Sequence, residues 1–241
     1  MSNLPSRWRR GAAGAGTDLT LASHVPHLYL AGPWRGQELP LDDDQRQHLH
    51  KVLRRRQGDP ISYTDGDGIS GQGVFTGGTV IRGEEILETR DRDLRVAVAP
   101  PDDKGRQRFL VEKLAELGVD RLTWLTTKRG EGKPLGPGKA GRWAVSALEQ
   151  SRSSHLMKVD GEPAKLSGLE GELWVCVSNG EPMPRARGGE TLVVGPEGGF
   201  SDEEIPAGAT RVSLGPSILR VETAALVAAA LYLDRFTKFG A

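Results

Sequence analysis

Two glycine-bearing segments near the C-terminal end of the chain have the residue types of a ligand site. The first, Gly195 to Phe200, follows the apolar run Leu192 to Val194. The second, Gly215-Pro216, follows the run Arg211 to Leu214. In open α/β sheets ligands bind outside the carboxyl ends of strands, and glycines let bare backbone approach the ligand closely. The two segments therefore predict a small-molecule site built from strand-end loops.

Neither segment has the signature of a common phosphate site. The loop from Gly195 to Phe200 has no Lys-Ser or Lys-Thr pair, which a P-loop requires, and its spacing is not Gly-x-Gly-x-x-Gly. Two ordinary turns in an α/β domain would contain the same glycines. On the glycines alone, that structural interpretation has as much weight as a ligand site.

Taken together, the segments resemble the RsmE methyltransferases of the SPOUT superfamily. The resemblance rests on Gly195 to Ser201, Leu214-Gly215 and Ile218 to Ala224. Lys104 to Arg108, with Glu112 to Val119, is similar to the EKxxELG helix of that family, and Ala147 to Ser151 is similar to its EQ helix. The match covers residues 24–239. It implies methylation of N3 of a uridine in the 16S RNA of the small ribosomal subunit.

The resemblance also implies the fold. It predicts a C-terminal SPOUT α/β domain, with a parallel sheet and a deep trefoil knot, at residues 91–241, and a small PUA-like β-barrel domain at residues 24–90. The chain pattern agrees, because strand and helix patterns alternate after residue 90, which is typical of a parallel sheet covered on both faces. Residues 1–23 are rich in Gly, Ala, Ser and Arg without periodicity, so we expect a flexible tail there.

Hydrophobic periodicity predicts the individual elements. In the N-terminal domain we expect strands at residues 27–30, 61–64, 69–75, 80–81 and 85–88, and one helix at residues 42–56. The turn Asp65 to Gly68 predicts a hairpin between the second and third of these strands. In the C-terminal domain we expect strands at residues 94–99, 122–126, 174–177, 192–194 and 212–214, and helices at residues 106–117, 139–151 and 222–239. The first of these helices is expected to bury its apolar stripe, Phe109, Leu110, Leu114 and Leu117.

The resemblance implies S-adenosylmethionine as the cofactor, held by backbone groups at the adenine edge and by Leu and Ile side chains on the ring. A third wall is expected from a loop after Val177. The candidate cofactor-binding residues are Ser178, Gly195, Glu197, Gly198, Leu214, Gly215, Ile218 and Leu219. The family's helices that resemble Glu112 to Val119 and Ala147 to Ser151 lie near the active site, so Lys113, Glu116, Glu149 and Gln150 are candidates to brace the pocket.

The implied chemistry needs a proton acceptor and a stabiliser of negative charge. Uridine N3 carries a proton, and its loss places negative charge on N3 and the flanking carbonyl oxygens. Arg220 is the candidate to stabilise that charge, by the logic of an oxyanion site. Glu197 or Glu222 could accept the proton, with Glu197 as the hypothesis. For Glu222 and Thr223 the preferred interpretation is a helix start, where an acid and a hydroxyl cap free amides.

A run of basic residues without an intervening acid lies in the helix predicted at residues 42–56. Such a run is ordinarily a solvated face. Because the resemblance places it in the RNA-binding domain, we favour phosphate contacts. The candidate RNA-binding residues are Arg46, His48, Lys51, Arg54 and Arg55, with Arg152 after the EQ pair. The implied partners are 16S ribosomal RNA, within the assembled small subunit, and a second copy of the chain, because the family is dimeric.

Composition limits the alternatives. The 32 basic and 32 acidic residues cancel, so net charge gives no support for RNA binding, although a local basic face could still bind RNA. The one cysteine, Cys176, is expected in a buried strand; it excludes a disulfide framework and agrees with the cytoplasm. No apolar run is long enough for a membrane span. No metal site is expected, because His48 and His50 point to different helix faces.

Two departures from the family pattern leave alternatives open. The chain has His24-Val25-Pro26-His27 where the family favours an arginine, and Ser153 to Met157 lacks the family's proline. These changes put the RNA contacts in doubt, so a knotted methyltransferase acting on another RNA position is one rival. Another is a non-catalytic RNA-binding or ribosome-assembly factor, which the intact Arg220 and both glycine loops disfavour.

Overall fold

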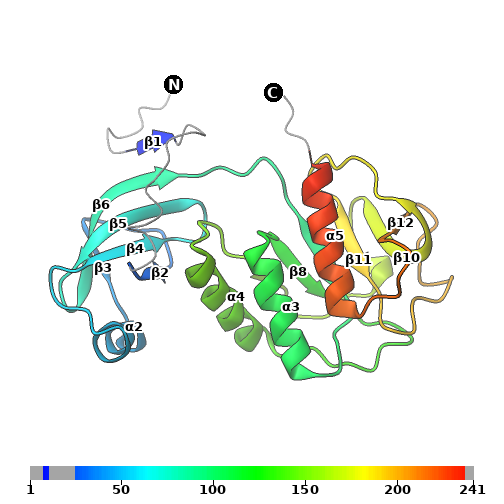
Figure 1. Cartoon of the computed structure of the whole chain (residues 1–241), viewed down its shortest axis with the longest axis horizontal. Helices are drawn as coiled ribbons and strands as arrows, with labels where there is room; N and C mark the ends of the chain where they lie inside the picture. The colour runs from blue at the N-terminus through cyan, green and yellow to red at the C-terminus, as the bar shows by residue number, and fades with distance from the viewer. Residues whose placement is uncertain (1–7, 11–24, 237–241) are drawn as a thin grey trace. The chain divides into compact units, whose positions relative to one another are not determined.

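The computed structural model describes residues 8–10 and 25–236, and their contacts divide them into two compact units (Figure 1). Unit 1 contains the described residues up to Arg90 together with Leu148–Leu156. Unit 2 contains Asp91–Ala147 and the described residues from Met157 onward. The tail predicted at residues 1–23 falls outside the described residues, except for strand β1 (Trp8–Arg10), which pairs in parallel with β6.

Unit 1 is a six-stranded mixed sheet in the order β1-β6-β5-β4-β2, with β3 on β6. Its remaining strands are β2 (His27–Tyr29), β3 (Glu38–Pro40), β4 (Pro60–Thr64), β5 (Ile69–Phe75) and β6 (Thr79–Leu87). The predicted hairpin at Asp65 to Gly68 is confirmed, because β4 and β5 pair antiparallel on either side of it. The two strands predicted at residues 80–81 and 85–88 are wrong, because they form one strand, β6. A β-carbon on Gly83 would lie 2.4 Å from the Gln72 carbonyl oxygen, so this glycine marks a close strand approach and not a break.

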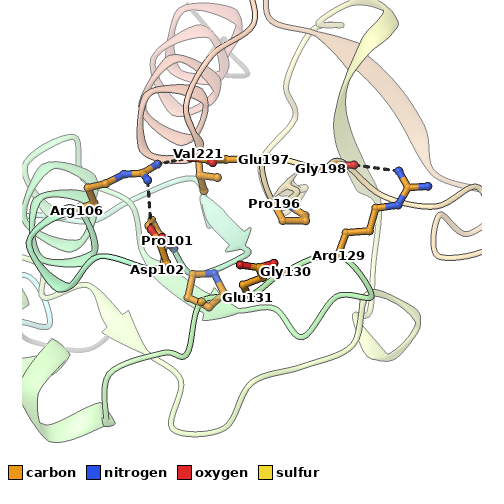
Figure 2. A pocket seen from close by; sticks show the side chains of 12 residues that line it. Pro101, Asp102, Arg106, Arg129, Gly130, Glu131, Pro196, Glu197, Gly198 and Val221 are labelled. Carbon is orange, nitrogen blue, oxygen red and sulfur yellow. Dashed lines mark hydrogen bonds and ion pairs between the residues drawn. The ribbon is translucent and has the colours of Figure 1, made fainter.

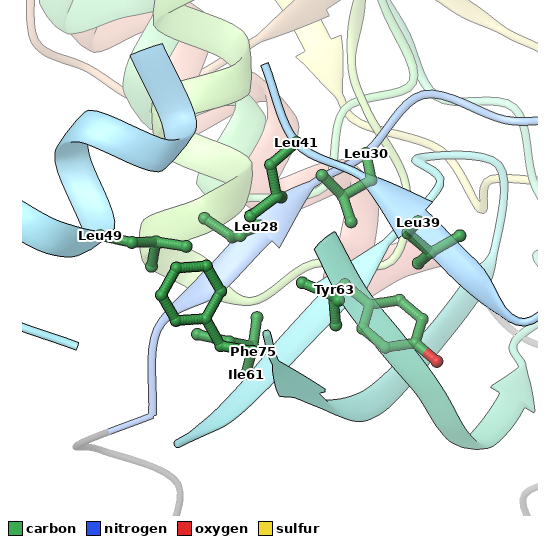
Figure 3. Close-up of a cluster of buried hydrophobic side chains, with 9 residues drawn as sticks. Leu28, Leu30, Leu39, Leu41, Leu49, Ile61, Tyr63 and Phe75 are labelled. Atoms are coloured by element: carbon green, nitrogen blue, oxygen red, sulfur yellow. The ribbon is translucent and has the colours of Figure 1, made fainter. Parts of the chain in front are cut away.

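Buried apolar side chains fill one face of this sheet (Figure 3). They come from five strands, the residues directly after two of them, and the helical segment: Leu28, Leu30, Leu39, Leu41, Leu49, Ile61, Tyr63, Phe75 and Val80. The helix predicted at residues 42–56 is too long. The α-helix α2 (Asp43–Gln47) continues into a π-helical turn, η1 (His48–Val52), and Arg54 has a positive φ of 52°. Val52 and Leu53 are exposed after the buried Leu49, so no apolar stripe holds a further turn.

The segment Leu148–Leu156 belongs to unit 1 through hydrogen bonds with its loops. The Tyr29 amide donates to Oε1 of Glu149 at 3.0 Å, and the Gly68 amide donates to the carbonyl of Ser154 at 2.9 Å. The guanidinium of Arg152 donates to the Val25 carbonyl. Glu149 and Arg152, predicted to brace the active site and to bind RNA, therefore have structural contacts inside unit 1.

Unit 2 contains a six-stranded sheet in the order β12-β10-β11-β7-β8-β9, and every pairing in it is parallel, as predicted. The strands are β7 (Arg95–Val98), β8 (Arg121–Trp124), β9 (Lys158–Val159), β10 (Leu173–Pro182), β11 (Thr191–Val194) and β12 (Thr210–Ser213). The helices are α3 (Lys104–Glu116), α4 (Pro137–Ser151), whose last turn from Leu148 belongs to unit 1, and α5 (Val221–Arg235), with a short 3-10 turn, η2 (Leu166–Gly168). All four residues of β11 are buried, as expected for a strand covered on both faces.

Helix α3 differs from prediction at one side chain. Asp103 caps it by accepting from the Arg106 amide at 2.8 Å, and Gly118 ends it with a φ of 75°. Its buried residues are Gln107, Leu110, Val111, Leu114 and Ala115. Phe109, predicted to be buried, is 45% exposed. Each helical residue turns by about 100°, so Phe109 points away from the face that the buried residues define.

Helix α5 is tied to the loop before β11 by the buried carboxylate of Glu190. The Tyr232 hydroxyl donates to Oε2 of Glu190 at 2.6 Å, and the amides of Arg187 and Gly188 donate to the same carboxylate at 2.7 and 2.9 Å. Burial raises the pKa of Glu190, but these three hydrogen bonds together lower it below its usual range. The helix, predicted to reach residue 239, ends at Arg235. No helix among the described residues has the length and apolar character needed to cross a membrane.

Replacing Tyr232 with Phe should lower the free energy of unfolding by about 1.5–3 kcal/mol, because a buried carboxylate loses one of its donors. Urea unfolding measures the change. Tyr29→Phe is the control, since the Tyr29 hydroxyl has no hydrogen bond recorded among the described residues. An equal loss in both variants would contradict the anchoring role of Tyr232.

His27 should make unit 1 sensitive to acid. Burial lowers its pKa from 6.5 to about 4, against a smaller raising effect of the Ser153 backbone. Below pH 6.5 His27 therefore binds a proton in the unfolded chain but not in the folded chain. The free energy of unfolding falls as the pH decreases until about pH 4. At pH 5 the loss is about 2 kcal/mol.

The measurement compares urea unfolding at pH 7 and pH 5 for the wild type, His27→Gln and the exposed control His48→Gln. The wild type and the control should lose about 2 kcal/mol more than His27→Gln. If His27→Gln shows the same pH dependence as the wild type, His27 does not titrate as its burial requires.

Candidate active site

The Gly195 to Phe200 loop follows β11 and owes its shape to its glycines. A β-carbon on Gly195 would lie 2.8 Å from the ring of Phe200, so a side chain at this position would displace that ring. Gly199 has a φ of 65°, and its amide donates to the Pro196 carbonyl at 2.8 Å, which closes the turn. The turn leaves Glu197 at the surface, with 64% of its side chain exposed.

The loop predicted after Val177 is wrong, because the chain continues there as a strand. Strand β10 continues to Pro182, and its register on β12 shifts between Cys176 and Glu181. Gly180 permits this, because a β-carbon there would lie 2.4 Å from the carbonyl carbon of Val212. Ser178 is therefore an exposed residue of an irregular strand segment beside β12, and not part of a strand-end loop.

The loop after β12 is open to solvent. Gly215 has a φ of 119° and no atom within 4 Å of the position of a β-carbon. Ile218 is 99% exposed, while Leu214 and Leu219 are half-buried. Bare glycine backbone beside an uncovered apolar side chain suits a flat ligand with apolar faces and a polar edge. The residues of this loop therefore fit the adenine part of the predicted cofactor.

Arg106, on the first turn of α3, joins two of the predicted site residues. Its Nε lies 3.1 Å from both oxygens of Glu222, and its Nη2 lies 2.8 Å from Oε2 of Glu222. The same Nη2 donates to Oε1 of Glu197 at 2.8 Å, and Nη1 reaches Asp102 at 3.5 Å (Figure 2). One guanidinium thus binds the loop after β11, the start of α5 and the loop after β7.

The electrostatics keep this cluster ionised. The carboxylate of Glu222, foremost, and that of Glu197 raise the pKa of Arg106. Burial alone would raise the pKa of Glu222, which is 8% exposed, but Arg106 lowers it. The preferred interpretation of Glu222 and Thr223 as helix caps is corrected, because Arg220 occupies the N-cap position of α5 and the carboxylate of Glu222 serves mainly Arg106.

A cavity of about 330 Å³ lies beside this cluster, at the carboxyl ends of β7, β8 and β11 (Figure 2). We call it the loop pocket and define it by its lining: Pro100–Asp102, Arg106, Arg129–Gly132, Pro196–Gly198 and Val221. Arg106 and Arg129 stand on opposite sides of it, and Nη1 of Arg129 donates to the Gly198 carbonyl at 2.9 Å. The carboxyl edge of a parallel sheet is where ligands of α/β proteins bind.

A second cavity, of about 560 Å³, lies at the opposite edge of the sheet, beside the first residues of β7, β8 and β11. Its Arg121 pairs with Asp160 at 2.7 Å, and Asp160 also accepts from Thr123 at 2.5 Å. This cavity is larger, but it contains none of the predicted site residues. The loop pocket is therefore the better candidate for chemistry.

The structure separates the predicted site residues into groups. Glu197 and Gly198 line the loop pocket, and Gly195 begins the same loop. Leu214, Gly215, Ile218 and Leu219 belong to the loop after β12, and the exposed Arg220 follows them immediately before α5. Lys113 binds Glu116 at 2.7 Å on the surface of α3, and Gln150 is exposed.

The predicted RNA-binding residues, apart from Arg152, gather on the helical segment of unit 1 and the turn after it. Arg46 pairs with Asp43, whereas His48, Lys51 and Arg54 are exposed and Arg55 is half-buried. In the described part of the chain, no three His, Cys, Asp or Glu side chains form a group that could hold a metal ion.

Sequence reasoning missed Arg106 and Arg129. Arg106 follows β7, which is the neighbour of β11, and Arg129 follows β8, the next strand in the sheet, so the carboxyl-edge rule could have pointed to them. Their partners lie 116 and 69 residues away in the chain, at Glu222 and Gly198, and spacing along the sequence does not show such contacts.

Comparisons with known proteins agree with this site. Residues 88–233 match a family described as the RNA methyltransferase domain. The ribosomal RNA small subunit methyltransferase E of Mycobacterium bovis is 30% identical over 228 residues, which are 81% of this chain and 86% of that protein.

Two solved structures are similar over most of the chain. The ribosomal RNA small subunit methyltransferase E of Neisseria gonorrhoeae, bound to S-adenosylmethionine, is 26% identical with a TM-score of 0.77, covering 88% of this chain and 98% of its own. A methyltransferase of Legionella pneumophila, also with S-adenosylmethionine, is 25% identical with a TM-score of 0.77, covering 89% and 99%. The predicted fold class, a SPOUT α/β domain with a PUA-like β domain, is confirmed by these likenesses and by the two sheets.

Replacing Arg106 with Ala should lower the free energy of unfolding by about 2–4 kcal/mol, because it leaves the buried carboxylate of Glu222 without its counter-ion. The control is Arg108→Ala on the same helix, whose exposed pair with Glu112 is worth less than about 1 kcal/mol. Urea unfolding measures both. A loss in Arg106→Ala no larger than in Arg108→Ala would show that the cluster does not stabilise unit 2.

Proposed function

The chain belongs to the ribosomal RNA small subunit methyltransferase E family, and from this premise we propose that it methylates N3 of a uridine in 16S ribosomal RNA with S-adenosylmethionine as methyl donor. One observation carries the proposal. The Gly195 to Phe200 loop, which follows β11, lies between two features. The open glycine loop after β12 is on one side of it, and a cavity of nucleotide size is on the side of β7. A methyltransferase needs two adjoining sites of this kind, one for the donor and one for the acceptor.

The donor site is formed by the irregular segment at Ser178, the loop after β11 and the loop after β12. Bound S-adenosylmethionine supplies a methyl group on a sulfonium, which is the leaving position for transfer to a nucleophile. Backbone groups at Gly195, Gly198 and Gly215 would bind the polar edge of its adenine, and among the three Gly215 has open space where a β-carbon would lie. Ile218, whose side chain is uncovered, would pack on the apolar ring face.

The two acidic candidates for the proton acceptor are unequal. Glu222 is buried and bound by three contacts from Arg106, which lower its pKa and make it a poor base. Glu197 is mostly exposed at the rim of the loop pocket, and Arg106 fixes it through Oε1. We therefore assign Glu197 as the group that accepts the N3 proton of the uridine.

Arg220 is the proposed stabiliser of the charge that develops on the uridine carbonyl oxygens. It is exposed at the start of α5, and its backbone is extended. Its charge lies close enough to contribute to the lowered pKa of Glu222, so it belongs to the same electrostatic cluster. A guanidinium that is accessible and close to the loop pocket can bind an incoming oxyanion.

The proposed setting follows from the substrate. Ribosomal RNA places the reaction in the cytoplasm, on the small subunit, and we propose RNA-phosphate contacts for Arg46, His48, Lys51, Arg54, Arg55 and Arg152. We also propose a homodimer, for which the exposed Phe109 on α3 is apolar surface that a second copy would cover.

The test is methyl transfer from labelled S-adenosylmethionine to unmodified small ribosomal subunits, with nuclease mapping of the product. Wild-type protein should give a single N3-methyluridine. Arg220→Ala should lower kcat about 100-fold or more, with cofactor affinity unchanged, because it removes one donor to the developing charge. The control Arg211→Ala, an exposed arginine 3.8 Å from Asp202, should behave as the wild type.

Each contrary result has a defined meaning. Labelling at another atom or nucleotide would overturn the uridine-N3 assignment and favour the rival RNA position. Absence of S-adenosylmethionine binding would overturn the enzyme and leave the non-catalytic RNA-binding factor. An Arg220→Ala protein with unchanged kcat would remove Arg220 from the site.

A further inference from the structure

We propose that the loop pocket receives the target base itself, and that Arg106, Glu197 and Arg129 read the Watson–Crick edge of uracil in it. The inference rests on the proposed function and goes beyond it, because it assigns the substrate site and its selectivity to residues outside the cofactor loops. Arg106 and Arg129 are the two additions to the predicted site.

The sheet order sets the location. Strand β11 has β10 and β12 on one side and β7 and β8 on the other. The open glycine loop follows β12, and the loops Pro100–Asp102 and Arg129–Gly132 follow β7 and β8. The loop at Pro196–Gly198 therefore separates the cofactor side from the loop pocket. A base in the loop pocket would lie across one loop from the methyl donor, as group transfer requires.

The size and walls of the loop pocket fit one nucleotide. Its volume of about 330 Å³ is near the lower limit for ligand sites, so it has room for a base with its ribose and not for a duplex. Pro100, Pro101, Pro196 and Val221 provide rigid apolar walls for the faces of a planar ring. A base must leave its stack to enter such a pocket, which the modification of N3 demands in any case.

The charges of the loop pocket favour a base and disfavour phosphate. Asp102, Glu131 and Glu197 line it together with two arginines, so its acids outnumber its bases. Phosphate groups of the RNA backbone would be repelled by three carboxylates. A neutral ring with donors and acceptors on its edge avoids this repulsion, because it can pair with both kinds of group.

The order of groups around the loop pocket matches uracil. The edge of uracil presents an acceptor, a donor and an acceptor, at O2, N3–H and O4. Glu197 is an acceptor, and the guanidinium groups of Arg106 and Arg129 are donors on either side of the pocket (Figure 2). Cytosine has an acceptor at N3 and a donor at its amino group, so it would leave the carboxylate and one arginine without partners.

Arg106 and Arg129 are each held in place by hydrogen bonds, and each keeps N–H donors that a ligand can use. The Nη1 of Arg106 makes only the long 3.5 Å contact with Asp102, whose side chain is 75% exposed, so a base carbonyl can take that donor. Its other nitrogens hold Glu222 and Glu197 and keep the fork in place. Arg129 is held through Nη1 by the Gly198 carbonyl, which leaves Nη2 for a ligand.

The first experiment fills the loop pocket and leaves Arg106, Glu197 and Arg129 unchanged. Glu131→Trp places a bulky ring at its exposed rim, and Lys128→Trp, whose native side chain pairs with Glu203 outside the pocket, is the matched control. With saturating cofactor, Glu131→Trp should lower kcat/KM for small ribosomal subunits by about tenfold or more, and Lys128→Trp should stay within about twofold of wild type. The affinity for S-adenosylhomocysteine should be unchanged in both. Equal activity of the two variants would overturn the proposal.

The second experiment tests the reading of the edge. Arg129→Ala should lower kcat/KM about 10- to 100-fold, the cost of one charged hydrogen bond. Subunits with cytidine at the target position should be poor substrates for the wild type. In Arg129→Ala the loss from uridine to cytidine should be smaller, because one discriminating donor is gone. An unchanged uridine-to-cytidine ratio would show that Arg129 does not read the base.

A third measurement separates this proposal from the proposed function. Small-subunit RNA transcribed with 4-thiouridine in place of uridine is photo-crosslinked to the protein in the presence of S-adenosylhomocysteine, and the crosslinked peptides are mapped. Crosslinks in residues 100–102, 129–132 or 196–198 that Glu131→Trp abolishes would support the pocket even if no methyl transfer were found. Crosslinks confined to other segments would overturn the pocket even in an active enzyme.

Discussion

The candidate site depends on one guanidinium that neutralises two carboxylates from distant parts of the chain. Glu222 is buried, and an ionised carboxylate without a partner would be costly there. Arg106 donates hydrogen bonds to Glu222 from Nε and Nη2, and Nη2 also donates to Glu197. The planar fork can bind both acids at once, which a lysine ammonium could do only as a point charge. The loop after β11 and the start of α5 therefore have a defined position relative to α3.

The parallel sheet supplies the second constraint. Its strand order brings the carboxyl ends of five strands that are distant in sequence to one edge. These strands are β12, β10, β11, β7 and β8, with β11 in the middle. Two glycines make this arrangement possible for opposite reasons. Gly195 gives space to a neighbouring ring, whereas Gly215 has open space and a backbone conformation that side chains rarely adopt. The same residue type thus serves packing at one loop and ligand access at the other.

The sequence predicted the parts of this protein that local patterns determine. The parallel strands and the hairpin at Asp65 to Gly68 follow from periodicity and turn chemistry. The errors have physical causes: Gly83 breaks the apolar pattern yet lies inside β6, and the basic run after Leu49 lacks a buried face to extend the helix. The contacts of Arg106 and Arg129 could not be predicted from local spacing, because their partners lie 116 and 69 residues away in the chain. The family motifs identified one wall of the site, and the other walls required the sheet order.

The balance of charge in the chain explains why selectivity has to be local. With 32 basic and 32 acidic residues, no general attraction to RNA is expected, so under the proposed function docking would depend on clusters such as the exposed His48, Lys51 and Arg54. In the proposed base site, the mixture of acids and bases that lines the loop pocket has a consequence for selectivity. A site with carboxylates between arginines repels phosphate and accepts a base that offers both donors and acceptors. Affinity for the RNA backbone and recognition of the base are then carried by different residues, and a change in one need not alter the other.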